Sequence, residues 1–365
     1  MHSTKKFKVI DLFSGCGGLS RGFIDAGYEV VLGVDNNEVA LKTFKENHNG
    51  AEVLSIDLFD KNAVAKIKKI VGNHIDVIVA GPPCQGFSLT GTRKFDDKRN
   101  RLYLSVIEAV NKLRPKAFLI ENVPGLASLY DGAIKDEIIK RLNKSGYNVR
   151  VKILRAADYG VPQMRTRVFF VGLQKKYGEF SFPNPTHTSD EYVTCSDAIG
   201  DLPSLDSETG IEEAEYSGPA KTSYQKIMRK SSRKLYNHIA TQHTDYVKSV
   251  IAQVPEGGNH KDLPPGVGES RKFNEAWTRY HSRKPSKTID TGHRNHFHYK
   301  HNRIPTVREN ARLQSFPDNF RFLGTRTEQN RQVGNAVPPL LGYHIGRQIL
   351  HYLNSKKYAN RKSKN

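Results

Sequence analysis

The sequence has 365 residues, of which 37% are hydrophobic, and it contains 16 Tyr and 17 Phe. At roughly 100–200 residues per domain, this is enough for one large α/β core and a smaller second domain. No apolar run approaches the ~20 residues that span a bilayer. The first residues also lack the apolar segment of a signal peptide. We therefore expect a soluble, cytoplasmic protein that has no membrane partner.

The charge of the chain is strongly positive, with 57 Lys and Arg against 37 Asp and Glu, or +20. Such a balance predicts a polyanionic partner, and nucleic acid is favoured. The three cysteines, Cys16, Cys84 and Cys195, are odd in number and lack metal-type spacing, which excludes a disulfide framework and favours a reducing compartment. Five histidines between residues 281 and 301 have no recognisable ligand spacing, so no metal site is predicted.

Short apolar runs alternate with amphipathic stretches of helix length from residue 7 to about residue 175. This alternation predicts an α/β fold with a doubly wound, mainly parallel sheet. The predicted strands cover residues 8–12, 29–34, 75–80, 117–120, 149–154 and 167–172. The predicted helices cover residues 19–26, 39–46, 102–113 and 133–144.

The alternation of strands and helices stops near residues 182–185, and helix-forming regularity returns over 304–352. We therefore expect a large domain formed by residues 1–184 and 304–354, and a second, smaller domain formed by residues 185–303. Residues 355–365 are basic and polar, which predicts a disordered tail.

A glycine-rich turn follows the first predicted strand, at Ser14-Gly15-Cys16-Gly17-Gly18. Glycines there allow a tight turn and the close approach of a ligand, which indicates a nucleoside-bearing cofactor. Asp35 ends the second strand, where a carboxylate that binds ribose hydroxyls is expected, and Asp57 could supply a third polar contact. The third glycine of the dinucleotide fingerprint is absent, so NAD is disfavoured. The alternative is that these glycines only make a turn and the acids only solvate strand ends.

The most informative stretch of the chain is residues 81–88, Gly-Pro-Pro-Cys-Gln-Gly-Phe-Ser, which directly follow an apolar run. Two prolines stiffen the backbone before Cys84, and Gly86 frees the loop after it. This arrangement suits a presented nucleophile. Taken alone, it also fits an inert, half-buried thiol between a strand and a helix.

Five segments, taken together and in this order, resemble the cytosine-C5 DNA methyltransferases, a family that uses S-adenosylmethionine. These segments are residues 11–18, 81–88, 121–123, 163–167 and 334–339. The resemblance covers about 7–175 and 303–352. It implies a Rossmann-like catalytic and cofactor-binding domain made of 1–184 and 304–354, and a target-recognition domain made of 185–303.

The resemblance also implies roles in a cofactor pocket. Phe13 would stack on the adenine ring, Asp35 would bind the ribose hydroxyls, and Asp57 would bond the adenine amino group. The implied cofactor-binding residues are Phe13, Ser14, Gly15, Gly17, Gly18, Asp35, Asp57, Pro83, Asn335 and Val337.

For catalysis, the resemblance implies that the Cys84 thiolate adds to C6 of cytosine and makes C5 nucleophilic. Glu121, at the end of a predicted strand, would stand beside N3; without the resemblance, it could equally cap the next turn. Gln163, Arg165 and Arg167 alternate along a strand-like segment, so we expect them on one face, where such a row can hold O2 of the base and the adjacent phosphates. We assign Arg167 to the base site and count Arg165 with it among the catalytic residues. No residue clearly fits the removal of the C5 proton, and water is a candidate.

A cytosine inside a duplex is out of reach, so the base must be flipped out of the stack. The basic segment 88–101 could clamp the DNA, with Gly86 and Gly91 as flexible points; a solvated loop is the alternative. The predicted DNA-contacting residues are Gln85, Ser88, Arg93, Lys94, Arg99, Thr288 and Arg294.

We therefore expect a DNA cytosine-5 methyltransferase that acts on a short double-stranded sequence. Because no regulatory domain is attached, a bacterial restriction–modification setting is favoured, with a separately encoded endonuclease as a candidate partner and a monomer as the active form. The alternatives are a tRNA cytosine methyltransferase, a non-catalytic nucleic-acid-binding regulator, and a dehydrogenase that binds NAD.

Overall fold

The computed structural model describes residues 6–72, 74–83, 102–267, 276–292 and 295–362 of the chain. The chain divides into two compact units. Unit 1 comprises residues 1–155, 166–184 and 339–365, and unit 2 comprises residues 156–165 and 185–338.

Unit 1 is built on a seven-stranded sheet with the strand order β3-β2-β1-β4-β5-β7-β6. Its strands are β1 (Lys8–Leu12), β2 (Glu29–Asp35), β3 (Glu52–Ser55), β4 (Val77–Ala80), β5 (Ala117–Asn122), β6 (Tyr147–Arg155) and β7 (Thr166–Gln174). The first five strands are parallel, and β7 runs antiparallel between β5 and β6. The predicted doubly wound, mainly parallel sheet is therefore confirmed.

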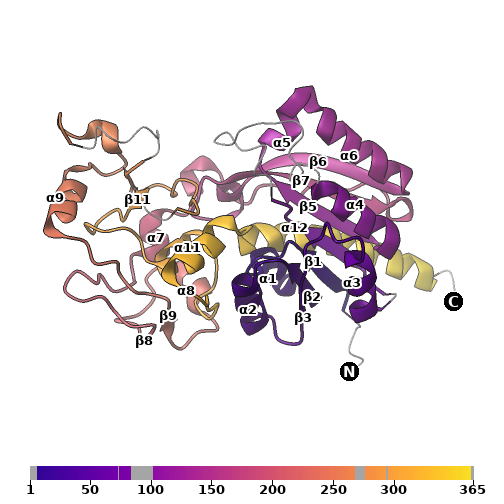
Figure 1. Cartoon of the computed structure of the whole chain (residues 1–365), viewed down its shortest axis with the longest axis horizontal. Coiled ribbons are helices and arrows are strands. Elements are labelled where there is room, and N and C mark those ends of the chain that lie inside the picture. The colour runs from indigo at the N-terminus through magenta and orange to yellow at the C-terminus, as the bar shows by residue number, and fades with distance from the viewer. Residues whose placement is uncertain (1–5, 73, 84–101, 268–275, 293–294, 363–365) are drawn as a thin grey trace. The chain divides into compact units, whose positions relative to one another are not determined.

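Helices cover both faces of this sheet. They are α1 (Gly18–Asp25), α2 (Glu38–Asn47), α3 (Ala63–Val71), α4 (Leu102–Leu113), α5 (Gly125–Ser128), α6 (Ala133–Lys144) and α12 (Pro339–Lys362), with short 3-10 turns η2 (Leu129–Gly132) and η4 (Lys175–Tyr177). On one face, α3, α4 and α6 enclose an apolar core that includes Ile10, Phe118 and Phe170. On the other face, α1 packs beside α12 (Figure 1). Gly22 permits this approach, because a Cβ there would lie 2.4 Å from the Pro339 carbonyl oxygen.

Sequence reasoning missed two elements of this unit, the strand β3 and the helix α3, and one prediction needs correction. The strand β3 gives a weak signal because it has only four residues and none of them is fully buried. The predicted disordered tail is wrong for residues 355–362, which continue α12. No glycine or proline interrupts the chain there, so nothing in the sequence ends the helix.

Unit 2 is made of short elements joined by long connections. They are η3 (Ala156–Tyr159), η5 (Ser189–Glu191), α7 (Cys195–Ile199), β8 (Glu213–Ala214), α8 (Ser223–Arg229), β9 (Leu235–Tyr236), α9 (Asp245–Gln253), η6 (His260–Asp262), β10 (Thr278–Arg279), β11 (His296–Phe297), α10 (Val307–Leu313) and α11 (Arg326–Asn335). Buried ion pairs hold them together. Arg312, which is fully buried on α10, bonds Asp318 at 2.6 Å and Asp201 at 2.8 Å.

The division into units differs from the expected domain boundary at residues 303 and 304. Residues 304–338 group with residues 185–303 rather than with the sheet of unit 1. The physical reason is the charge pairing of α10, since Glu309 binds Arg303 through two hydrogen bonds of 2.7 and 2.8 Å and Arg312 reaches back to Asp201. A role of this unit in target recognition stays a prediction.

Replacing Arg312 by Leu should destabilise unit 2 by about 3–5 kcal/mol, because Asp201 and Asp318 would remain buried without their partner. The single tryptophan of the chain, Trp277, packs in this unit beside Phe297, so its fluorescence during urea unfolding reports the change. As a control, Arg21→Leu removes an exposed pair with Asp25 and should shift stability by no more than about 0.5 kcal/mol. Equal unfolding midpoints for the two variants would contradict this view of the core.

Candidate functional site

The glycine turn after β1 has a backbone that few residues adopt. Phe13 has φ 57°, and Gly15 and Gly17 have φ 52° and 92°. The turn is closed by hydrogen bonds from Ser14 N to Val34 O, of 3.0 Å, and from Gly17 N to Ser14 O, of 2.9 Å. A left-handed conformation costs a residue such as Phe13 roughly 1–2 kcal/mol. Strain of this kind is concentrated at functional positions, so the turn is a candidate ligand site.

Asp35, at the end of β2, holds this turn from the side. Its Oδ2 accepts a hydrogen bond of 2.8 Å from Gly15 N, and its Oδ1 accepts one of 2.9 Å from Asn37 N. Each carboxylate oxygen can accept a second hydrogen bond. Asp35 is therefore oriented by the backbone and keeps the capacity to bind ligand hydroxyls.

A second carboxylate of the predicted pocket, Asp57, follows β3. It is exposed, and its Oδ1 accepts a hydrogen bond of 2.9 Å from Phe59 N, which fixes its orientation. The structure thus presents both acids at the ends of neighbouring parallel strands, β2 and β3.

The turn also fits a polar ligand in another respect. The buried hydroxyl oxygen of Ser14 has no hydrogen-bond partner in the part of the chain that the structure describes. Apart from Gly15 itself and its chain neighbours, no heavy atom of the described residues lies within 4 Å of where a Cβ on Gly15 would stand, so the backbone is open there to close approach. An unsatisfied buried hydroxyl beside an open glycine turn is typical of a binding site.

Sequence reasoning missed His48, which follows the end of α2 and contacts the backbone of the glycine turn. Its Nδ1 lies 2.7 Å from Phe44 O, and its Nε2 lies 3.2 Å from Gly17 O. A Cβ on Gly17 would lie 2.2 Å from His48 Cε1, so only glycine fits this position. Burial lowers the pKa of His48 to about 4, and the ring is therefore neutral at pH 7. No pattern in the sequence points to this contact.

The remaining predicted pocket residues belong to different parts of the fold. Gly18 begins α1, and Pro83 is the last described residue before Cys84. Asn335 ends α11 as an exposed residue, and Val337 is buried two positions later; both belong to unit 2. Their contribution to a cofactor pocket stays a prediction.

The turn before Cys84 is tied to the end of β5. Strands β4 and β5 are parallel neighbours, so the segments that follow them emerge at the same edge of the sheet. Asn122, which is buried, donates a hydrogen bond of 3.1 Å from Nδ2 to Pro82 O. Its Oδ1 accepts one of 2.8 Å from Val123 N. Asn122 therefore fixes the backbone of residues 81–83 relative to Glu121.

Glu121 lies at this edge with its carboxylate largely buried. Its Oε1 is 3.1 Å from Arg167 Nε, and Arg167 also donates from Nη1 to Thr166 O at 2.7 Å. The second oxygen, Oε2, lies 3.6 Å from where a Cβ on Gly81 would stand. Burial lowers the pKa of Arg167, while Glu121 opposes this effect. The ion pair thus aims one carboxylate oxygen at the turn that leads to Cys84.

The predicted row of Gln163, Arg165 and Arg167 on one strand face is wrong in its first part. Strand β7 begins at Thr166, so only Arg167 belongs to it. Gln163 is fully buried in unit 2, where its Nε2 bonds Gln314 and its Oε1 accepts a hydrogen bond of 3.2 Å from Ile289 N. Arg165 is 2% exposed and also belongs to unit 2. Its catalytic role stays a prediction.

Several predicted residues lie outside the described residues. These are Cys84, Gln85, Ser88, Arg93, Lys94, Arg99 and Arg294, together with the predicted clamp 88–101. Thr288 is described and is exposed, between buried Ser286 and buried Ile289. A contact from Thr288 to a base stays a prediction.

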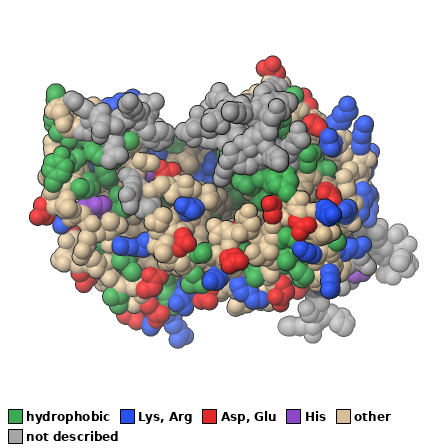
Figure 2. Space-filling view, in the orientation of Figure 1, with side chains coloured by type: hydrophobic (Ala, Val, Ile, Leu, Met, Phe, Trp, Pro, Cys, Tyr) green, Lys and Arg blue, Asp and Glu red, His purple; other side chains and the backbone are tan. Residues whose placement is uncertain are grey.

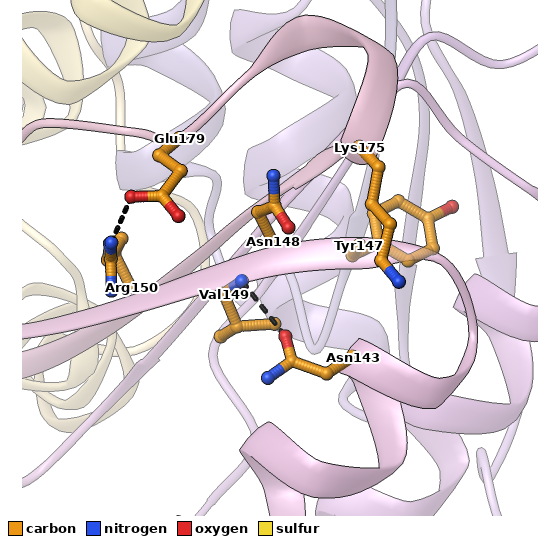
Figure 3. Close-up of a pocket in the computed structure, with 7 residues that line it drawn as sticks. All are labelled: Asn143, Tyr147, Asn148, Val149, Arg150, Lys175 and Glu179. Carbon is orange, nitrogen blue, oxygen red and sulfur yellow. Dashed lines mark hydrogen bonds and ion pairs between the residues drawn. The ribbon is translucent and has the colours of Figure 1, made fainter.

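One surface pocket lies elsewhere in unit 1. It is lined by Asn143, Tyr147, Asn148, Val149, Arg150, Lys175 and Glu179, and Arg150 pairs with Glu179 across it (Figure 3). Tyr147 begins β6 at the same edge as Ala117, the first residue of β5. This pocket is therefore at the opposite edge of the sheet from Glu121.

On the face drawn in Figure 2, Lys and Arg side chains are interspersed with Asp and Glu rather than gathered in one patch.

Comparison with known proteins identifies the family. Residues 7–351 match the model of the C-5 cytosine-specific DNA methylase family. The chain belongs to this family. It is accordingly a DNA cytosine-C5 methyltransferase, and the resemblance stated from the five segments is confirmed.

Similar proteins agree with this assignment. The Type II methyltransferase M1.HphI of Haemophilus parahaemolyticus is 40% identical, over 93% of this chain and 86% of the relative. M.DdeI of Desulfomicrobium norvegicum, also a Type II methyltransferase, is 35% identical, over 96% of this chain and 90% of the relative. A crystal structure of a protein encoded within an E. coli prophage matches with a TM-score of 0.78 and 28% identity, covering 95% of this chain and 99% of that one. No helix of the described residues is long and apolar enough to cross a membrane.

Replacing Asn122 by Asp should lower the rate of methyl transfer about tenfold or more. The variant keeps an acceptor for Val123 N but sets a carboxylate oxygen against Pro82 O, and an unsatisfied buried group costs about 1–3 kcal/mol. The measurement is incorporation of labelled methyl into DNA at saturating cofactor. Asn148→Asp is a matched control, because Asn148 also donates to a backbone carbonyl, Gly178 O, but lies near the opposite edge of the sheet. If both variants retained the wild-type rate, Asn122 would not position the turn.

Proposed function

We propose that this enzyme transfers a methyl group from S-adenosylmethionine to C5 of a flipped-out cytosine in a specific, short double-stranded DNA sequence. The observation that carries the proposal is the Glu121–Arg167 ion pair beside the Gly81–Pro83 turn, because it sets a buried carboxylate next to the segment that ends in Cys84. Glu121 and the Gly81–Pro83 turn both lie at the carboxyl ends of parallel strands, which is where open α/β sheets bind their ligands.

The glycine turn would hold the cofactor. Phe13 would stack on the adenine ring, Asp35 would accept from the ribose hydroxyls, and Asp57 would bond the adenine amino group. The hydroxyl of Ser14, which has no hydrogen-bond partner among the described residues, and the open backbone at Gly15 support a polar ligand at this place. When bound, S-adenosylmethionine supplies an electrophilic methyl group on a sulfonium centre.

The reaction of the base begins at Cys84. Its thiolate forms a bond to C6, and the C5=C6 electrons move through the ring to N3, where Glu121 delivers a proton. Arg167 holds Oε1 of Glu121 at 3.1 Å and so orients the carboxyl group that would carry that proton. C5 would then take the methyl group that the bound donor supplies, with the electrons of the broken C–S bond remaining on the donor's sulfur.

The enzyme is then regenerated by elimination. Loss of the C5 proton to water re-forms the C5=C6 bond and expels the Cys84 thiolate, while N3 returns its proton to Glu121. Overall, cytosine and S-adenosylmethionine give 5-methylcytosine, S-adenosylhomocysteine and one proton. The base must leave the helical stack for C6 to meet Cys84, and the basic segment 88–101 would clamp the opened duplex.

The biological setting is inferred from the relatives. Both M1.HphI and M.DdeI are named Type II methyltransferases, so a restriction–modification role is proposed for this chain, with a separately encoded endonuclease as partner. A monomer suffices, because one base is flipped at a time. The tRNA alternative has less support, since the family model and these relatives describe DNA methylases or Type II methyltransferases.

The decisive experiment measures transfer of labelled methyl from S-adenosylmethionine to unmethylated plasmid DNA, with bisulfite sequencing to locate the modified cytosines. Wild type should modify cytosines in one short sequence, and Cys84→Ala should abolish incorporation because the thiolate that activates C5 is missing. Transfer to tRNA without transfer to duplex DNA would overturn the proposed substrate. Undiminished transfer by the variant would overturn the covalent mechanism.

Replacing Glu121 by Gln should lower kcat about 10²–10⁴-fold, because the amide cannot deliver a proton to N3. Binding of S-adenosylmethionine, measured by calorimetry, should change little. Glu137→Gln serves as the matched control, since it breaks an exposed Glu–Arg pair on α6, with Arg141 at 2.6 Å. A Glu121→Gln enzyme with a wild-type kcat would remove this residue from the chemistry.

A further inference from the structure

Asp11 is a buried carboxylate directly beneath the glycine turn. It is 1% exposed and lies one residue before the end of β1, where it pairs with Gly33 of β2 and Val79 of β4. Its neighbours Ile10 and Leu12 face the apolar core under α3 and α4, so alternation along the strand points Asp11 to the side of α1. There its Oδ2 accepts a hydrogen bond of 2.7 Å from the buried hydroxyl of Ser20.

A second carboxylate acts on Asp11 from the neighbouring strand. Asp35 lies two residues after Gly33, the partner of Asp11, and therefore on the same face of the sheet. Asp35 accepts a hydrogen bond from Gly15 N, so both acids lie next to the same turn. Both also act on the thiol of Cys16 in that turn, although burial is the main reason why its pKa rises to about 12.

Arg21, the residue after Ser20 on α1, pairs with Asp25, and its charge acts on His48 at the same turn but is not among the groups that act on Asp11. The groups that act on Asp11 are Ser20 on α1 and Asp35 on β2. His48, which reaches the turn from α2, is neutral because burial lowers its pKa to about 4. Burial raises the pKa of Asp11 to about 7, the repulsion from Asp35 adds to this effect, and the Ser20 hydroxyl opposes it. The protonation state of Asp11 therefore changes near neutral pH.

We propose that Asp11 is a positioning residue that favours the cationic S-adenosylmethionine over its neutral thioether product at the glycine turn. The inference rests on the proposed function, because it takes the turn as the cofactor site. The two molecules share an ammonium and a carboxylate and differ in the sulfonium charge. A buried carboxylate beside the half-buried Asp35, with no cation among the groups that act on Asp11, attracts that extra charge; once the methyl group has left, the attraction ends and product release is favoured.

The expected pH dependence has a definite sign. Protonation of Asp11 removes its attraction for the sulfonium as the pH falls through about 7, and ionisation restores that attraction as the pH rises above this value. With the pKa near 7, the ionised fraction rises about tenfold from pH 6 to pH 8. Affinity for S-adenosylmethionine should rise by up to that factor, and affinity for S-adenosylhomocysteine should rise much less.

The test is calorimetric titration of the whole chain with S-adenosylmethionine and with S-adenosylhomocysteine at pH 6, 7 and 8. The ratio of the two affinities cancels the titration of the shared ammonium group, and the wild-type series needs no variant. We expect this ratio to rise about three- to tenfold. In Asp11→Asn, which keeps an acceptor for Ser20, the ratio should be lower at pH 8 and independent of pH.

Controls separate the outcomes. Asp25→Asn removes an exposed carboxylate from α1 and should leave the wild-type pH dependence unchanged. A constant ratio in the wild type, or identical profiles for wild type and Asp11→Asn, would show that Asp11 only anchors α1 and would overturn the proposal. Failure of either molecule to bind at any pH would instead contradict the proposed cofactor site.

Discussion

The site depends on one constraint, the parallel alignment of β1, β2, β4 and β5 in the sheet of unit 1. Because parallel neighbours end at the same edge, the four segments that follow them are brought together without any dedicated contact. The glycine turn, Asp35, the Gly81–Pro83 turn and Glu121 each come directly after one of these strands or end it. The strand order sets their order along the edge, and the register brings the strand ends to the same level, since Leu12 pairs with Ala80, and Ala80 with Ile120.

Polar contacts then fix the segments that the sheet brings together. Asp35 holds Gly15, Asn122 holds Pro82, and Arg167 holds Glu121, so each turn or acid is fixed by a group from a neighbouring strand or its end. Such contacts are buried or half-buried, where a hydrogen bond contributes more and a missing partner costs more than in water. The edge is thereby held in one arrangement before any ligand arrives, which reduces the reorganisation that binding requires.

The sequence reveals the parts of this design that depend on local pattern. Alternating apolar runs predicted β1 as residues 8–12 and α4 as residues 102–113, as the structure has them, and the motif order predicted that Glu121 ends a strand. Contacts between distant residues leave no such pattern. Asp11 reads as a strand residue and His48 as a helix end, and only the fold shows that both support the glycine turn. The strand expected over 163–167 failed for the same reason, because buried partners in unit 2, and not alternation, decide where Gln163 points.

The distribution of charge follows from the two kinds of ligand that this chemistry requires. The chain carries a net charge of +20, which suits a polyanionic duplex, yet three acids, Asp11, Asp35 and Asp57, flank the glycine turn that we propose as the cofactor site. A cationic methyl donor would be repelled by a uniformly basic surface, and DNA would be repelled by a uniformly acidic one. The sheet edge resolves this conflict by placing carboxylates at or just beyond the ends of β1, β2 and β3, while Arg167 is placed beside Glu121 further along the edge. The donor and the base can thus meet at one edge although their charges require opposite surroundings.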